Sequence, residues 1–540
     1  MKVWMKWVVA AALVLALAVW IWKMFAWIDP PLDSAIAAHG NTDWHIDTAN
    51  EFLFGTDMGG TATAANHAPA GWTRDHIHVG STNTAHFYFD DDRTSPGDDD
   101  DATDGIDRQM LFFYAGHGNP TGWNTLGNNG TQSSVLLGDV ARSLRYYWQC
   151  SCEVFAHGPQ TCPGESLVYA CPQSFDGSSD SSSMRNVYER WGPALGDDLR
   201  MACGVSTDAW CHEGNVNRIW DNYNNKGFDV ADSFIQGLAG GTDAVPLCIT
   251  TGGFSAGSTP LYDSVFTNAR NPSGAYLHIQ YLDGFDSTAP DIFGPIPEYL
   301  PELELVPLPL PDPWRAYGLQ EVDGVLVSRE QVEGRGPRFR VQPASGALYV
   351  RGERKVEAGQ PLAEAEYLDA ARRVAAEQGW SEESSGTPQG SRMMLATAQR
   401  RTGKPEGEPA QKDVLVTIRR VLDLDGVRAP VLGPGGAITV QLNNDGTVLN
   451  AAKVWRTIAA HGAMLPVKPY EAALEEAIAE LGEARQSYRL LAWQWGYEEE
   501  AGNVEQRTMR MVYLFDFTPR SPEDVLDHPL RRVRVEGQVG

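Results

Sequence analysis

The chain has 540 residues, more than one hydrophobic core usually organises, so we expect at least two domains. Hydrophobic residues make up 42% and aromatic residues 10%, which supplies enough apolar surface to fold and excludes global disorder. Lys and Arg number 43 against 70 Asp and Glu, and the net charge of −27 would repel a phosphate backbone. This balance excludes a DNA- or RNA-binding protein.

The N-terminus predicts a membrane anchor. An unbroken apolar run from Trp7 to Trp22 follows Lys2 and Lys6. As a helix this run would be roughly 24 Å long, and its flanking residues could extend it into the interface. Basic residues before the run leave the N-terminus in the cytoplasm and export the body of the protein. We therefore expect residues 1–28 to be a single-pass anchor with a periplasmic or extracellular body, and a cleaved signal peptide is the alternative.

A proline-rich segment divides the rest of the chain. Eight of the 33 prolines lie between Pro290 and Pro313, where they favour stiff, extended backbone. The sequence therefore predicts a front domain at 29–289, a linker at 290–315 and a back domain at 316–540.

Strand-like and helix-like segments alternate in the front domain. This order predicts an α/β fold, a mostly parallel sheet with helices on both faces. The predicted strands are 109–115, 146–155, 199–205 and 245–250, and the predicted helices are 134–144, 184–195 and 216–238.

The back domain has a different pattern, in which helices precede groups of strands separated by turn signals such as Asp425-Gly426. It predicts an α+β domain with antiparallel hairpins. The predicted helices are 362–378 and 470–481, and the predicted strands are 414–422, 437–442, 488–495 and 508–517.

All seven cysteines lie between Cys150 and Cys248. In an oxidising compartment the simplest arrangement is three disulfides and one free thiol. An inert buried cysteine, or a disulfide to another chain, would also account for the odd number.

Two strand ends carry the residues with catalytic chemistry. The first strand runs into Gly116-His117-Gly118, and the next runs into Cys150-Ser151-Cys152. Neighbouring parallel strands would bring the imidazole and a thiol together at the carboxyl edge of the sheet. Thiol catalysis needs these groups, because the thiolate attacks, the imidazole moves the proton and backbone N–H groups receive the oxyanion.

These motifs, between residues 107 and 253, resemble those of the caspase-like clan of cysteine peptidases, which includes caspases, gingipains, clostripain and legumain. The resemblance implies a caspase-like domain, a Cys–His dyad and hydrolysis of peptide or protein substrates through an acyl-enzyme. It assigns His117 as the dyad histidine, Gly118 as an oxyanion donor and Cys152 as the nucleophile. Cys150 is the other candidate for the nucleophile, although the small residue typical of the clan precedes Cys152.

The resemblance also implies that the segment containing Ser206, Thr207 and Asp208 borders the substrate cleft. We therefore expect an exported cysteine endopeptidase that needs no metal at its catalytic site and no cofactor. The alternative is a non-catalytic surface binding protein, or pseudoenzyme, on the same fold with all its cysteines structural.

Two further segments suggest ligands or partners. The acidic loop from Asp98 to Asp107 has clustered carboxylates that could bind Ca²⁺, although runs of like charge are usually solvated. The back domain resembles cystatin-like modules and propeptides of secreted proteases, which implies inhibition, chaperoning or docking against the catalytic domain. A plain structural platform is the alternative role.

Overall fold

The computed structural model describes most of the chain after residue 200 and selected segments before it. The described ranges, apart from short gaps and isolated positions, are 34–39, 72–78, 109–115, 117–119, 122–125, 128–131, 144–150, 199–205, 213–239, 245–255, 259–306, 320–322, 325–327, 338–354, 360–380, 386–399, 406–520 and 531–539.

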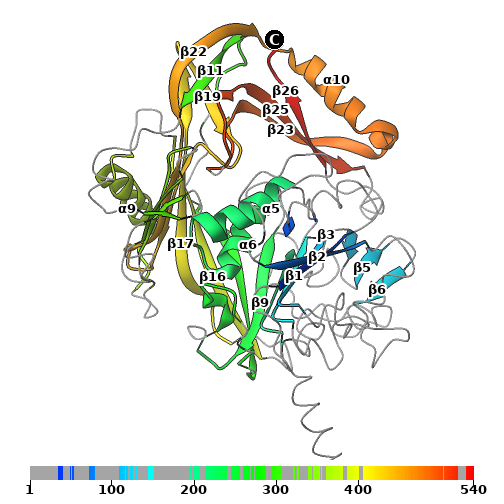
Figure 1. Cartoon of the computed structure of the whole chain (residues 1–540), viewed down its shortest axis with the longest axis vertical. Helices are drawn as coiled ribbons and strands as arrows, with labels where there is room; N and C mark the ends of the chain where they lie inside the picture. Colours follow the sequence, from blue (N-terminus) through cyan, green and yellow to red (C-terminus); the bar gives the residue numbers. More distant parts are fainter. Residues whose placement is uncertain are drawn as a thin grey trace, which may run out of the picture.

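A long mixed sheet forms the centre of the structure (Figure 1). Its order from one edge to the other is β12 (Gln320–Val322), β13 (Val325–Val327), β14 (Arg338–Gln342), β15 (Ala347–Arg351), β21 (Val448–Val454), β20 (Ala437–Leu442), β17 (Ala410–Arg419), β16 (Gln389–Gln399), β10 (Tyr276–Gly284), β9 (Pro246–Gly252), β8 (Met201–Val205), β7 (Tyr146–Cys150), β3 (Leu111–Ala115), β1 (Ser34–His39) and β2 (Thr73–His78).

Only one end of this sheet is parallel. Strands β8, β7, β3, β1 and β2 run parallel to their neighbours, whereas the pairs from β8–β9 through β10–β16 to β12–β13 are antiparallel. Strand β10 pairs along its whole length with β16, so the sheet continues without a break from residues before the proline-rich segment to residues after it.

The fold class predicted from the sequence was therefore wrong. The described residues are mostly strand, in large mixed sheets with few helices, and they do not form a mostly parallel sheet covered by helices on both faces. The physical reason lies at 216–238, which the sequence predicts as one helix. The structure has α5 (Glu213–Trp220), a π-helical turn at Asp221–Asn225 and α6 (Val230–Ala239).

The break turns the second helix back along the first. Gly227 has a φ of +70°, a left-handed conformation that favours glycine and ends the helical run. Arg218 then donates to the carbonyl of Gly237 and Asn222 to that of Ser233, so α5 and α6 are antiparallel. Two antiparallel helices return the chain to the end of the sheet where β8 finished. Strand β9 consequently runs antiparallel to β8, whereas a single crossover helix would have made it parallel.

Close packing of these two helices depends on Gly237. A Cβ atom built there would lie 2.7 Å from the backbone nitrogen of Ile219 and 2.8 Å from its Cα. We expect Gly237→Ala to lower the free energy of unfolding by about 1–3 kcal/mol, because the two backbones must separate. Denaturant unfolding measures this loss. Gly284→Ala is the matched control, because a Cβ there meets nothing within 4 Å, and equal stability of the two variants would contradict the prediction.

Aromatic side chains fill the space between the parallel strands and the two helices. The ring of Trp148 on β7 lies 5.6 Å from that of Trp220 on α5 and 5.4 Å from that of Phe234 on α6. Phe113 of β3 stacks on Phe52 at 3.9 Å. Each of these side chains is buried, and burial of a large apolar side chain contributes about 1.5–3 kcal/mol. The strand ends that carry the candidate site therefore rest on a dense core.

Helix α9 (Glu364–Glu377) packs on the other face of the sheet, against β16, β17 and β20. Successive strand residues point to opposite faces. Val414 accordingly packs in the same hydrophobic cluster as Tyr367 of α9. The preceding residue, Asp413, points to the opposite face, where it pairs with Arg354, and Arg354 also contacts Asp232 of α6. The predicted helix at 362–378 is confirmed.

A second group of strands lies at the C-terminal end of the molecule, at the top of Figure 1. The five-stranded sheet consists of β18 (Val421–Leu424), β19 (Val427–Leu432), β23 (Tyr488–Glu498), β25 (Met511–Pro519) and β26 (Arg531–Glu536). Beside it are β22 (Thr457–Pro466), β11 (Tyr299–Val306) and β24 (Thr508–Met509), and α10 (Tyr470–Glu480) packs on β25 and β26.

The predicted hairpin at Asp425-Gly426 is confirmed. Strands β18 and β19 pair antiparallel around it, and both turn residues have positive φ, 54° and 87°. This conformation is that of the two-residue turns that match the twist of a hairpin. Part of the proline-rich segment also enters this region, because residues Tyr299–Val306 form β11 and pair with β22.

The predicted localisation is corrected. In the ranges described above, no helix is both long and apolar enough to cross a membrane. The longest, α9, has 14 residues, about 21 Å at 1.5 Å per residue and shorter than a hydrocarbon core of about 30 Å. The segment 1–28, which the sequence predicts as the anchor, lies outside the described residues. A single-pass anchor with an exported body is therefore not supported.

Candidate functional site

The two strands that end in the candidate catalytic residues are neighbours. Strands β3 and β7 pair in parallel, and Ala115 is the register partner of Cys150. Both strands finish at this pair, on the same edge of the sheet. In the sequence, His117 comes two residues after Ala115, and Cys152 comes two residues after Cys150. The predicted adjacency of these two strands is confirmed.

The chain leaves the long sheet directly after β3. His117 and Gly118 belong to β4 (His117–Asn119), which pairs with β5 (Gly122–Thr125). Strand β6 (Asn128–Thr131) completes this small antiparallel sheet. The backbone of His117 and Gly118 therefore lies in β4, in the small sheet that follows β3 in the chain.

The other predicted site residues, namely Cys152, Ser206, Thr207 and Asp208, lie outside the described residues. Residues 98–107, where calcium was predicted, also lie outside them. Within the part of the chain that is described, no group of three or more His, Cys, Asp or Glu side chains is arranged to hold a metal ion.

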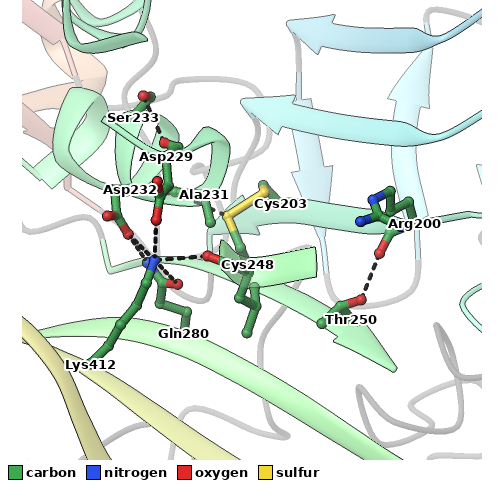
Figure 2. Close-up of a disulfide and its surroundings, with 11 residues drawn as sticks. Arg200, Cys203, Asp229, Ala231, Asp232, Ser233, Cys248, Thr250, Gln280 and Lys412 are labelled. Atoms are coloured by element: carbon green, nitrogen blue, oxygen red, sulfur yellow. Dashed lines mark hydrogen bonds and ion pairs between the residues drawn. A yellow bond between two sulfur atoms is a disulfide. The ribbon is translucent and has the colours of Figure 1, made fainter. Parts of the chain in front are cut away.

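Disulfides hold the strands beside this edge. Cys203 on β8 and Cys248 on β9 are direct partners across the antiparallel pair, and their sulfur atoms are bonded (Figure 2). Cys150, at the end of β7, is also disulfide-bonded. A bonded sulfur cannot act as a thiolate nucleophile. Of the two cysteines considered for the nucleophile, Cys152 therefore remains the candidate.

The amino ends of the strands are occupied by a polar network. Arg200 forms a bidentate ion pair with Asp263, with distances of 2.5 and 2.6 Å, and the hydroxyl of Tyr146 donates to the same carboxylate at 2.8 Å. The hydroxyl of Thr250 donates to the carbonyl of Arg200 at 2.6 Å (Figure 2). These contacts join the starts of β7 and β8 to β9 and to the loop that follows it. The polar groups of the network form hydrogen bonds with one another. We therefore expect a substrate to bind at the opposite edge of the sheet, where the carboxyl ends of the parallel strands lie.

A buried histidine lies on β10, away from the candidate dyad. The ring nitrogens of His278 are 3.0 Å from the hydroxyl of Thr397 and 2.8 Å from the carbonyl of Gly253. Burial lowers the pKa of His278, although the bond to Gly253 opposes this change. Its position between two strands indicates that it stabilises the sheet.

A buried charged cluster joins α6 to the antiparallel half of the sheet (Figure 2). The ammonium of Lys412 on β17 is 2.7 Å from the Asp232 carboxylate on α6 and 3.2 Å from that of Asp229. It also donates to the carbonyl of Leu261 at 2.7 Å and to the side chain of Gln280 on β10 at 3.1 Å. The side chains of Lys412 and Asp232 are fully buried.

Arg354 is the second cation of the cluster. Its guanidinium lies 2.6 Å from Asp229, 2.9 Å from Asp413 and 3.3 Å from Asp232. Three carboxylates thus share two cations, and every one of them has a cationic partner. Because buried charges are stable only when they are paired, this cluster is an internal tie between segments that are far apart in the sequence.

The two central carboxylates have opposite pKa shifts. Burial alone would raise the pKa of Asp232, but the charges of Lys412 and Arg354 outweigh burial and lower it. For Asp413, burial and the negative charge of Asp232 raise the pKa to about 6. Asp413 is therefore the member of the cluster that takes up a proton most readily.

We expect the raised pKa of Asp413 to make stability depend on pH. The unfolded carboxyl loses its proton near its ordinary pKa of 3.8, whereas the folded one keeps it until about pH 6. The contribution of the protonated Asp413 carboxyl to the free energy of unfolding is therefore complete below pH 4, and it is lost as the pH rises through 6. Asp413→Asn cannot ionise, so from pH 4 to pH 7 its stability should gain about 2–3 kcal/mol relative to the wild type.

Urea unfolding at pH 4 and pH 7 measures this difference. Asp369→Asn on the exposed face of α9 is the control, because its ion pair with Arg372 is solvent-exposed. An Asp413→Asn variant that follows the wild-type pH dependence would contradict the assignment.

The sequence predictions missed this cluster, although a signal was present. Asp232 is the one charged residue of a mainly apolar helix, and Lys412-Asp413 directly precede the apolar strand residues that begin at Val414. Charged residues at buried positions of periodic patterns indicate either a partner or a functional site. The partners are up to 209 residues apart in the sequence, as for Asp232 and Gln441, so the pattern alone does not identify them.

Comparisons with known proteins do not assign a family. No protein-family description matches the sequence, and no curated protein is similar to it. One solved structure with some likeness is an uncharacterized protein from Eubacterium rectale ATCC 33656. The two chains share 7% identity with a TM-score of 0.29, over 45% of this chain and 85% of the other. A likeness this low carries no argument about fold or function.

Proposed function

We propose that the protein is a cysteine endopeptidase in which Cys152 is the nucleophile and His117 transfers the proton. The observation that carries the proposal is the register of β3 and β7, in which Ala115 lies opposite Cys150. His117 and Cys152 follow these two partners in the sequence at the same spacing of two residues, which supports a dyad at this edge of the sheet. The motif resemblance to the caspase-like clan supports the same pair.

The proposed reaction has two steps. The thiolate of Cys152 attacks the carbonyl carbon of the substrate, the C–N bond breaks, and the amine leaves with a proton from the imidazolium of His117. Water, deprotonated by the neutral imidazole, then hydrolyses the thioester and restores the thiolate and the imidazolium. The backbone N–H of Gly118 is proposed to stabilise the oxyanion formed in both steps.

Three features of the surroundings favour this reading. The disulfide of Cys150 removes the other cysteine that was considered for the nucleophile. The aromatic core packs against β3 and β7, and the Cys203–Cys248 bridge joins β9 to β8, the neighbour of β7. The chain's net charge of −27 favours basic peptides as substrates.

The test uses the full chain with its disulfides intact. The protein is incubated with a mixed peptide library, and mass spectrometry detects cleavage before and after alkylation with iodoacetamide. We expect cleavage that alkylation abolishes, with the label on Cys152. Absence of a free thiol at this position, together with no cleavage, would overturn the proposal and support the binding protein with structural cysteines.

A further inference from the structure

A cavity of about 680 Å³ lies between α5 and the five-stranded sheet. Figure 1 shows α5 beneath β23, β25 and β26, and residues from all four elements line the cavity. The ends of β17 and β19 complete its wall. This volume is within the range of pockets that bind small molecules, which often form where separate sheets or domains meet.

Two arginines in this cavity form no ion pair with any carboxylate in the described part of the chain. Arg218 on α5 donates to the carbonyl of Gly237 at 3.0 Å and to the side chain of Asn215. Arg419 at the end of β17 donates to the carbonyls of Gly433 and Gly435 at 2.7 and 3.4 Å. Among the described residues, neither guanidinium forms an ion pair with a carboxylate.

The other arginines of the cavity are neutralised. Arg532 forms a bidentate pair with Asp516 at 2.6 and 2.9 Å, and Arg534 pairs with Glu498 at 2.5 Å. Arg420 lies 3.6 Å from a carboxylate oxygen of Glu499. Among the described arginines that line the cavity, Arg218 and Arg419 are therefore the two without an ion pair to a carboxylate.

Burial and neighbouring positive charges are unfavourable for a guanidinium. Burial, followed by the positive charges of Arg532 and Arg419, lowers the pKa of Arg218 to about 9. Burial also lowers the pKa of Arg419. An anion between the two guanidiniums would relieve this repulsion, and their bonds to backbone carbonyls already hold them in place.

The carboxylates of the cavity do not supply that anion. Asp291 accepts hydrogen bonds from the N–H and hydroxyl of Thr387 at 2.8 and 3.0 Å, and Glu498 is paired with Arg534. Burial and the charge of Glu498 raise the pKa of Glu500, whereas the charges of Arg534 and Arg456 oppose this change. The charged groups that lower the pKa of Arg218 are Arg532 and Arg419, and both are positive.

Apolar residues make up much of the remaining wall. They include Phe293, Val421, Val431, Leu432 and Leu514. Such a wall suits the carbon skeleton of a ligand, whereas a free inorganic ion would leave this surface hydrated.

We propose that this cavity binds a small organic anion, with its carboxylate or phosphate group between Arg218 and Arg419 and its apolar part against the surrounding wall. Guanidinium groups recognise both anions through paired N–H donors. This site does not depend on the proposed peptidase activity, because its residues lie at α5, β17 and the C-terminal sheet.

Calorimetric titration of the full chain with benzoate, phenyl phosphate and benzyl alcohol tests the proposal. We expect at least one of the two anions to bind with one-site stoichiometry and to raise the thermal midpoint with increasing concentration. Benzyl alcohol, which has the ring without the charge, should bind at least about tenfold more weakly. The tighter of the two anions identifies whether the site takes a carboxylate or a phosphate.

Arg218→Gln and Arg419→Gln should each weaken anion binding by about tenfold or more. Arg372→Gln on α9 should bind as the wild type does, because its ion pair with Asp369 is exposed and remote from the cavity. If one of the first two variants does not fold, the other still provides the comparison. Failure of the wild type to bind either anion at millimolar concentration, or equal binding by Arg419→Gln, would overturn the proposal.

Discussion

The Cys152→Ala variant should cleave a peptide substrate at least about a thousandfold more slowly in kcat/KM than the wild type. Removal of the nucleophile eliminates the acyl-enzyme route, and loss of one member of a catalytic unit costs nearly as much as loss of all of them. Cleavage is measured on a peptide that the wild type is found to hydrolyse. The variant should keep the wild-type midpoint of unfolding within a few degrees.

Ser151→Ala is the matched control, since it changes the neighbouring residue and should retain activity within a few fold. His117→Ala should lose activity to a similar extent as Cys152→Ala, and the double variant should lose little more than either. Equal turnover by Cys152→Ala and the wild type would exclude Cys152 as the nucleophile.

The Lys412→Met variant should lose about 3–5 kcal/mol of unfolding free energy. Methionine fills a similar volume, but it leaves Asp232 and Asp229 without the ammonium that lies 2.7 and 3.2 Å away. Removing one partner of a buried ion pair is costly because the remaining charge stays desolvated. Denaturant unfolding at pH 7 measures the loss. Arg372→Met, from an exposed pair on α9, should lose less than about 1 kcal/mol.

A second substitution separates the charge effect from packing. Asp232→Asn combined with Lys412→Met should be more stable than the sum of the two single losses predicts, because the neutral side chain no longer needs the cation. Additive losses, or a Lys412→Met variant within 1 kcal/mol of the wild type, would show that the ion pairs of the cluster do not account for the predicted loss of unfolding free energy.

Local patterns predicted individual elements well. Apolar runs located β3, β7, β8 and β9, and helical periodicity located α9 and α10. The turn residues Asp425 and Gly426 identified a hairpin because positive φ is confined to a few residue types. Each of these signals depends on residues close together in the chain, so it can be read without knowing the partner strands.

The order of strands in the sheet could not be predicted in the same way. The sequence at 216–238 is helical throughout, except that Gly227 and the π-helical turn before it redirect the chain. One such reversal changes β9 from parallel to antiparallel and lets β10 pair with β16. The α/β prediction assumed a single crossover helix, so it was wrong about the direction of β9 and about the strand pairings that follow it in the sheet.

For the candidate sites, the sequence by itself identified a histidine and a cysteine after consecutive apolar strands, since strand, turn and residue type are local properties. Only the tertiary structure decided that Ala115 lies opposite Cys150 and that Cys150 is already bonded. It also decided that Arg218 and Arg419 line one cavity, where neither pairs with a carboxylate of the residues that the structure describes. These facts depend on residues distant along the chain, whose contacts arise from burying one apolar surface against another. Because the hydrophobic effect is non-directional, the same apolar pattern permits several pairings, and backbone geometry at a few turns selects between them.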